Sequence, residues 1–189
     1  EDSVSQRNFV IKSKEYNYSI MSVSHMVAEE YPLHSFKISV IRNPYEKFVS
    51  SFDYIKEGGK NNPVFPDAEK YLQGFFIKNN INRPIDIFKA DKWVKDKILE
   101  NIFFKPQYTF ICDKSHNIIV DKLYKLEEIN KLYQYLNKLL DIKIDYKTKI
   151  NQTSLTSTLT PEEKQHIYDY YKLDFVIFGY EPLSLVLNI

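Results

Sequence analysis

The segment FKISVIRNPYEKFVSSFDYI, residues 36–55, constrains the fold most strongly. Its first six residues, FKISVI, form an apolar-rich run that favours a buried strand. From Pro44 onward, Phe48, Phe52 and Ile55 recur at the spacing of an amphipathic helix. Asn43 is a favourable N-cap residue, and proline is favoured at the first position of a helix. The sequence therefore predicts a strand at 36–41 that turns directly into a helix, without an intervening glycine.

This strand–helix corner has the chemistry of an anion-binding site. A helix N-terminus presents amide donors and the positive end of the helix dipole, which together favour a bound anion. Arg42, the last residue of the expected strand, can donate two parallel hydrogen bonds to a phosphate. Ser50, nearly two turns into the helix, could donate its hydroxyl to the same anion. An ordinary corner with a surface arginine and solvated serines explains these residues equally well, so both interpretations stay open.

The rest of the chain interleaves strand and helix patterns, which predicts an α/β fold with a helical majority. We expect one or two short strands within 8–23 and a hairpin of strands at 107–112 and 118–124 around a turn at 113–117. Helices are expected at 24–31, 68–78, 84–100, 126–140 and from Thr160, where Thr-Pro-Glu-Glu forms a capping box. Trp93, Phe175 and Phe178 are expected in the core.

Composition excludes several classes of protein. The 189 residues carry 26 basic and 25 acidic side chains, a balance that argues against a general nucleic-acid-binding protein. There are four glycines, and neither GxGxxG nor GxxxxGK[ST] occurs. With Cys112 as the single cysteine and no cluster at metal-ligand spacing, we expect no metal site.

No apolar run is long enough to span a membrane, so we expect any membrane attachment to come from a segment outside this sequence. The compartment stays open: a bacterial or viral cytosolic protein and a Golgi luminal domain both fit one cysteine and no membrane span.

The corner sequence RNPYEKFVSS resembles the 3′-phosphate-binding motif of sulfotransferases that use 3′-phosphoadenosine 5′-phosphosulfate (PAPS). The resemblance is to the carbohydrate branch of sulfotransferase family 2, which includes heparan 2-O-sulfotransferase-like enzymes. Four further blocks resemble the family in the same order along the chain. They are HMVAEEY, FFKPQYTFICDKSHNIIVDKLYKLEEI, INQTS and TPEEKQHIYDYYKLDFVIFGY.

The resemblance implies a P-loop-like sulfotransferase fold with a small central parallel sheet flanked by helices. It also implies transfer of a sulfuryl group from PAPS to a hydroxyl, above all on a carbohydrate, leaving adenosine 3′,5′-bisphosphate. By position, Arg42 and Ser50 would bind the 3′-phosphate, and Lys47 stands where the family usually has a second arginine. Asn151 would contact the nucleotide and His25 would be the catalytic base. For His25 and Asn151, an unspecialised helix residue and a solvated loop residue remain the alternatives.

One feature of the family is missing from the sequence. Family members carry a lysine-bearing loop for the 5′-phosphosulfate upstream of the His-led segment. Residues 1–23 contain Lys12 and Lys14 but no glycine that would let the backbone form such a loop. We expect the loop to lie before Glu1, so that residues 1–189 are one domain that binds nucleotide without measurable transfer. The alternative is a non-catalytic nucleotide-binding or interaction module on the same fold.

Overall fold

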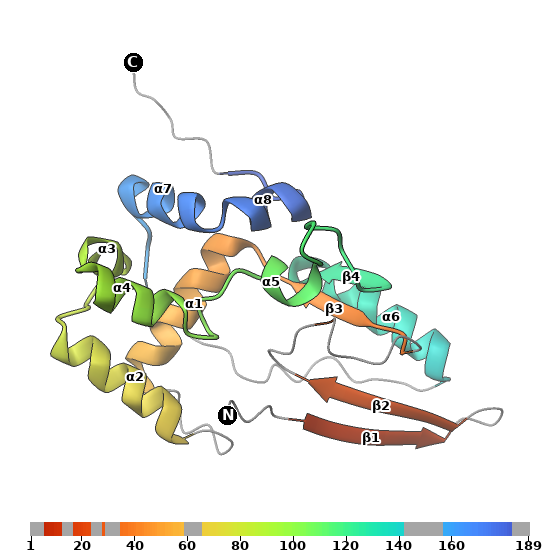
Figure 1. Cartoon of the computed structure of the whole chain (residues 1–189). Coiled ribbons are helices and arrows are strands. Elements are labelled where there is room, and N and C mark those ends of the chain that lie inside the picture. Colours follow the sequence, from red (N-terminus) through yellow and green to blue (C-terminus); the bar gives the residue numbers. More distant parts are fainter. Residues whose placement is uncertain are drawn as a thin grey trace. The chain divides into compact units, whose positions relative to one another are not determined.

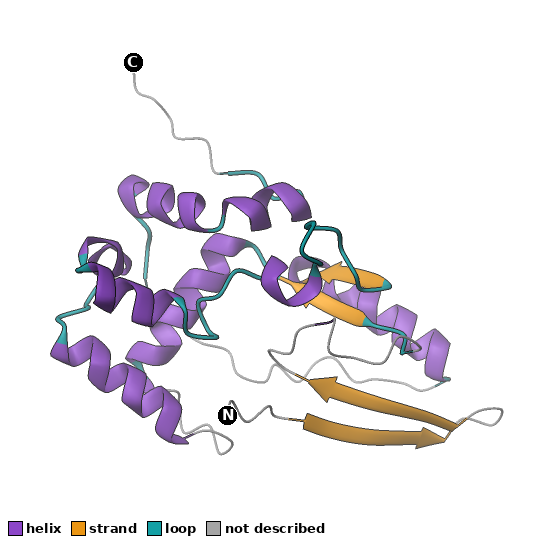
Figure 2. Ribbon diagram, viewed as in Figure 1, coloured by secondary structure: helices purple, strands orange, loops and turns teal. Residues whose placement is uncertain are grey.

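The computed structural model describes residues 6–12, 17–23, 28, 35–58, 66–141 and 157–182 (Figure 1). They belong to two compact units. The first unit comprises the chain up to Arg42 together with residues 109–152, and the second comprises residues 43–108 together with residues 153 onward. Both helices and strands are present, with a small parallel sheet, which confirms the α/β class (Figure 2). That residues 1–189 form one domain stays a prediction.

The first unit contains all the described strands. Strands β1 (Gln6–Lys12) and β2 (Asn17–Val23) form an antiparallel hairpin, in agreement with the expected pair of short strands. Strand β3 (Ile38–Ile41) pairs in parallel with β4 (Lys122–Lys125). The backbone N–H of Lys37 donates to the Asp121 carboxylate at 2.6 Å, which fixes the start of this pairing. The predicted strand at 36–41 is therefore confirmed, and its partner comes from a segment 84 residues further along the chain.

A helix follows β4 in the first unit. After a 3₁₀ turn at Leu126–Glu128, α6 runs over Ile129–Leu140, close to the helix expected at 126–140. Tyr135 of α6 stacks on Phe36 with ring centroids 6.4 Å apart, and the Lys122 ammonium lies 4.9 Å from the centroid of the Tyr135 ring. These contacts hold α6 against the end of the β3–β4 pair where both strands begin.

The described residues of the second unit form a helical assembly. Its elements are α1 (Pro44–Lys56), α2 (Pro66–Lys78), α3 (Pro84–Lys89), α4 (Lys92–Leu99), α7 (Pro161–Tyr170) and α8 (Lys172–Phe178), and the first residue of α5 (Tyr108–Ile111) belongs to it as well. Phe48 of α1 is at the centre of the core, with no exposed surface. The rings of Phe104, Phe88 and Tyr171 surround it at 5.3, 5.5 and 6.2 Å. The apolar face expected for the helix after Pro44 is therefore buried.

Two expectations for the core had different outcomes. Phe175 and Phe178 of α8 are buried, as predicted. The prediction for Trp93 was wrong, because its side chain is 65% exposed on α4 and contacts Phe75 with ring centroids 5.6 Å apart. Trp93 lies in the first turn of α4 and contacts α2 through Phe75, while most of its side chain stays exposed.

The strand predicted at 107–112 was also wrong. Residues Tyr108–Ile111 form the single helical turn α5, and the expected hairpin is reduced to one antiparallel bridge between Cys112 and Ile118. The Asp174 carboxylate of α8 accepts the backbone N–H groups of Gln107 and Tyr108, each at 2.8 Å. A side-chain acceptor thus takes donors that a strand would have used in a ladder, and the chain turns there.

The helix predicted over 84–100 is divided into α3 and α4. Ala90 is in an extended conformation, with φ −63° and ψ 159°. The Asp91 side chain then accepts the N–H of Val94 at 3.0 Å, so a new helix begins at residue 92. Aspartate at an N-cap competes with helix continuation, and here the cap prevails.

Three fully or almost fully buried carboxylates link segments of the second unit: Asp53, Glu163 and Asp174. Asp53 accepts from the N–H and hydroxyl of Ser157, at 3.3 and 2.5 Å. Glu163 accepts two hydrogen bonds from the Arg83 guanidinium, at 3.2 and 3.0 Å. It also accepts the Thr160 N–H at 2.7 Å while its own N–H is bonded to the Thr160 hydroxyl, which confirms the predicted capping box.

We expect Asp174→Ala to lower the free energy of unfolding by about 2–4 kcal/mol, because the buried N–H groups of Gln107 and Tyr108 lose their acceptor. Chemical denaturation measures the loss. The matched control is Glu162→Ala on α7, whose ion pair with Lys89 is more than half exposed at both ends and should contribute at most about 1 kcal/mol. Equal stabilities of the two variants would show that Asp174 is not an essential anchor.

Candidate functional site

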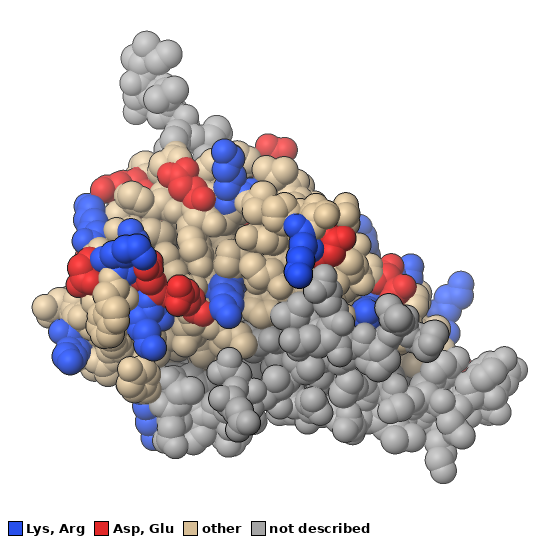
Figure 3. Space-filling view, in the orientation of Figure 1, with Lys and Arg blue, Asp and Glu red and all other residues tan. Residues whose placement is uncertain are grey.

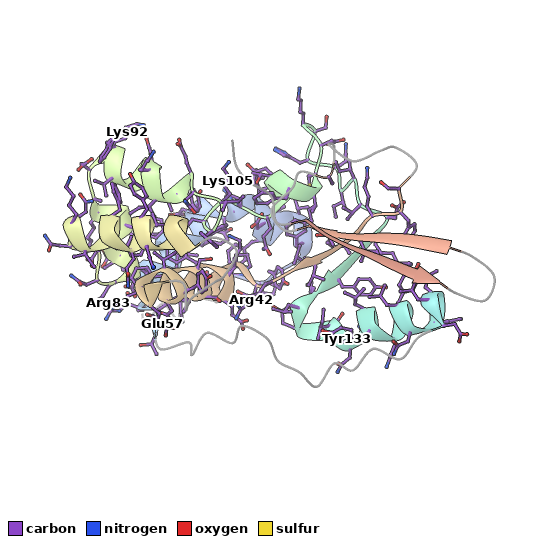
Figure 4. All side chains as sticks on the ribbon, turned by 90° about the horizontal axis from the view of Figure 1, so that it is seen from below. Arg42, Glu57, Arg83, Lys92, Lys105 and Tyr133 are labelled. Carbon is purple, nitrogen blue, oxygen red and sulfur yellow. The ribbon has the colours of Figure 1, made fainter. Side chains whose placement is uncertain are left out.

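The start of α1 has the predicted geometry. Asn43 is the N-cap, and its side-chain oxygen accepts the N–H of Tyr45 at 3.0 Å. Pro44 occupies the first helical position and is buried. The Asn43 carbonyl accepts the N–H of Lys47 at 2.8 Å, which closes the first turn. Arg42 lies immediately before this cap, where the chain passes from β3 to α1, and is partly buried (Figure 4).

The amide donors of this helix start are fewer than the sequence suggested. Pro44 has no N–H, and the N–H of Tyr45 is bonded to the Asn43 side chain. The positive end of the helix dipole remains, because it comes from the aligned peptide units of the 13-residue helix. An anion at this corner therefore depends mainly on side chains and on the dipole, and less on a set of backbone amides.

The two adjacent serines of α1 have different surroundings. The hydroxyl of Ser51 donates to the carbonyl oxygen of Phe103 at 2.8 Å, so Ser51 holds α1 to the segment that follows α4. Ser50 is partly exposed, and its hydroxyl makes no hydrogen bond to any of the residues that the structure describes. Of the two serines, Ser50 has the hydroxyl that can serve a ligand.

Lys47 is directed toward the core of the second unit. Its ammonium donates to the carbonyl oxygen of Phe103 at 2.8 Å and lies 5.2 Å from the centroid of the Tyr171 ring. Burial lowers the pKa of Lys47 to about 8, and the nearby Asp174 carboxylate only partly opposes this shift. That Lys47 contacts the nucleotide, as its position in the motif suggests, stays a prediction.

Around Lys47, polar groups of α8 and of its start hold residues 103–108. The Tyr171 hydroxyl donates to the carbonyl of Phe104 at 2.6 Å, and Asp174 accepts the two backbone N–H groups at 107 and 108. Burial raises the pKa of the Tyr171 hydroxyl and of the Asp174 carboxyl, although the hydrogen bonds to Asp174 act in the opposite direction. We call Lys47, Ser51, Tyr171 and Asp174, with the backbone of residues 103–108, the polar clasp.

Sequence reasoning did not find the polar clasp. One signal was available: Asp174 is the only charged residue in LDFVIF, and an isolated acid in an otherwise apolar helix indicates a buried acceptor. Its donors could not be inferred, because backbone N–H groups leave no trace in a sequence.

The other two predicted site residues lie outside the described residues. His25 and Asn151 fall in 24–27 and 142–156, so their roles stay predictions. Over the face shown in Figure 3, basic and acidic side chains of the described residues are interspersed, in line with the balanced composition.

A comparison with protein-family models identifies the chain. A family model for the sulfotransferase family (family 2) matches residues 2–181, which is nearly the entire chain. The chain is a member of the sulfotransferase family. No curated protein and no solved structure matches it.

Family membership gives the activity in general terms: a sulfuryl group is transferred to the hydroxyl of an acceptor. Such a transfer needs a held donor, a deprotonated acceptor oxygen and stabilisation of the charge on the leaving group. Within the part of the sulfotransferase that the structure describes, no three His, Cys, Asp or Glu side chains are grouped so that they could hold a metal ion. No described helix is long and apolar enough to cross a membrane.

The buried ammonium of Lys47 predicts a specific pH dependence of stability. In the unfolded chain Lys47 has its ordinary pKa of 10.5, whereas in the folded protein the value is about 8. Between these values the unfolded state binds more protons, so the free energy of unfolding rises with pH, by on the order of 3 kcal/mol over the whole window.

Denaturation of the sulfotransferase and of its Lys47→Met variant, at about pH 8 and about pH 9.5, measures this effect. The free energy of unfolding should rise more between these two pH values in the unmodified protein than in the variant, because methionine keeps the packing and removes the titrating group. Subtracting the variant cancels the titration of the tyrosines and other lysines. Parallel pH dependences of the two proteins would contradict the burial of the charge.

Proposed function

We propose that this sulfotransferase takes its sulfuryl group from PAPS, binds the nucleotide 3′-phosphate with Arg42 and Ser50, and sulfates a carbohydrate hydroxyl. The observation that carries the proposal is the different hydrogen bonding of the two adjacent serines of α1. Ser51 is bonded to the Phe103 carbonyl, whereas the hydroxyl of Ser50 is unused among the described residues. The motif that resembles the family's 3′-phosphate site names this same serine, so sequence and structure support one residue independently.

Arg42 and α1 supply the positive charge for this phosphate. A guanidinium can donate two parallel hydrogen bonds to a phosphate. The dipole of α1 adds a favourable interaction with an anion at the start of the helix. The resemblance supports Asn151 as a further nucleotide contact.

The reaction itself is an in-line displacement. The acceptor oxygen forms a bond to sulfur while the bond between sulfur and the bridging oxygen of the 5′-phosphate breaks, so that the leaving nucleotide carries the electron pair of that bond. The acceptor proton passes to a base, and the resemblance supports His25 in this role. A neutral imidazole near pH 7 is suited to accept a proton from a hydroxyl in the transition state. The carbohydrate acceptor rests on the resemblance to the carbohydrate branch of the family.

Nucleotide binding tests the 3′-phosphate assignment. Adenosine 3′,5′-bisphosphate should bind more tightly than adenosine 5′-monophosphate in titration calorimetry. Arg42→Ala should lower the affinity for the bisphosphate by at least about tenfold, which corresponds to the loss of one charge-assisted hydrogen bond. The affinity for the monophosphate should stay nearly unchanged. Lys92→Ala is the charge-matched control, because it also removes one cation and Lys92 is an exposed residue paired with Asp96. Equal affinities of the unmodified protein for both nucleotides would overturn the assignment.

Turnover tests the role of His25. In an active form of the enzyme, extended upstream if the 5′-phosphosulfate loop proves to be encoded there, His25→Ala should lower turnover by roughly 10²–10⁴ with little change in nucleotide affinity. Transfer from labelled PAPS to a panel of sugars measures turnover and identifies the acceptor class. His116→Asn is the control: His116 is exposed at φ 64°, a conformation that asparagine tolerates. Near-normal turnover of His25→Ala would exclude it as the base.

A further inference from the structure

Two side chains of α1 bind the same backbone atom. The Lys47 ammonium and the Ser51 hydroxyl, one helical turn apart, each donate to the carbonyl oxygen of Phe103 at 2.8 Å. Both side chains are partly buried. The carbonyl of the next residue, Phe104, accepts from the buried Tyr171 hydroxyl. Successive carbonyls are therefore held by α1 on one side and by the start of α8 on the other.

These contacts direct Lys47 away from a ligand role. Its ammonium has the Phe103 oxygen as acceptor, the Tyr171 ring at 5.2 Å and the charge of Asp174 nearby. Each of these partners is a buried or partly buried group of the second unit. An ammonium with this environment is already paired, and moving it to a phosphate would leave the Phe103 carbonyl with one donor fewer.

We propose that Lys47 is a positioning residue of the nucleotide site: it fixes the Ser50-bearing turns of α1 against residues 103–108 and does not itself bind phosphate. The proposal rests on the proposed function, since it concerns the 3′-phosphate site. In the motif, Lys47 stands where an arginine would be expected to contact the anion, and the proposal gives it a supporting role instead. Ser51 acts through the same carbonyl, so the two side chains form one support for the turns of α1 that carry Ser50.

The pH dependence of nucleotide affinity distinguishes a positioning lysine from a phosphate ligand. A lysine with a pKa of about 8 that binds phosphate must take up a proton on binding at higher pH, so affinity would fall by up to about tenfold per pH unit above that value. The second phosphate pKa, about 6, lies below this window. The groups that face Lys47 from α8 and from its start are Asp174 and Tyr171, and Tyr170 lies beside Tyr171 with ring centroids 4.8 Å apart. Burial raises the pKa of both tyrosine hydroxyls, so neither loses its proton in this window.

The experiment is titration of adenosine 3′,5′-bisphosphate into the full 189-residue chain at about pH 7.5 and about pH 9.5. We expect the affinity to change less than about threefold, against roughly thirtyfold for a phosphate-binding lysine. Lys47→Met and Ser51→Ala should each weaken binding by about three- to tenfold, and the double variant should lose less than the product, because both act through the Phe103 carbonyl.

Three results would overturn the proposal. One is an affinity that falls steeply with pH in the unmodified protein and not in Lys47→Met. Another is unchanged affinity in Lys47→Met, which would make the residue purely structural. A third is independent, multiplicative losses in the double variant. If Lys47→Met does not fold, the pH series on the unmodified protein and the Ser51→Ala variant still decide the question. If the unmodified protein binds neither nucleotide, the proposed function fails as well, while the pH dependence of stability still reports whether the Lys47 charge is buried.

Discussion

The buried carboxylate of Asp174 is the interaction on which the second unit most depends. It has no exposed surface, accepts the N–H groups of Gln107 and Tyr108, and faces the charge of Lys47. A buried carboxylate is tolerated only when donors and a counter-charge surround it. Those donors come from the segment after α4 and the counter-charge comes from α1, so one side chain requires three distant parts of the chain to meet.

The polar clasp also explains why separate sequence blocks of the sulfotransferase belong together. Lys47 and Ser51 come from RNPYEKFVSS, Phe103 and Gln107 from FFKPQY, and Asp174 from the closing block. All three blocks carry the resemblance to the family, yet their meeting point is structural. Of the described motif residues, Ser50 has its hydroxyl outside the clasp, which is why it is proposed, with Arg42 of the same motif, as a nucleotide contact.

Local signals in the sequence were sufficient for several elements. The cap at Asn43, the proline at the start of α1 and the capping box at Thr160 are interactions within four residues, and the structure contains each of them. Prediction failed where a distant group decided the outcome. Residues 107–112 have strand-like composition, but Asp174, 66 and 67 residues away, captures the N–H groups there. The partner of β3 could not be inferred either, because the sequence of one strand in a parallel pair carries no signal that identifies its partner strand.

The sequence by itself determined the family, the α/β class and the strand-to-helix corner with Arg42 and Ser50, because these depend on residue order and short-range spacing. Only the tertiary structure decided which side chains at that corner are available to a ligand. Lys47, Ser50 and Ser51 are all polar residues on one helix, and the sequence alone does not show which of them hydrogen-bond to another part of the protein. The Phe103 carbonyl makes that distinction. Every residue carries such a backbone acceptor, so only its position in space shows which side chains it binds.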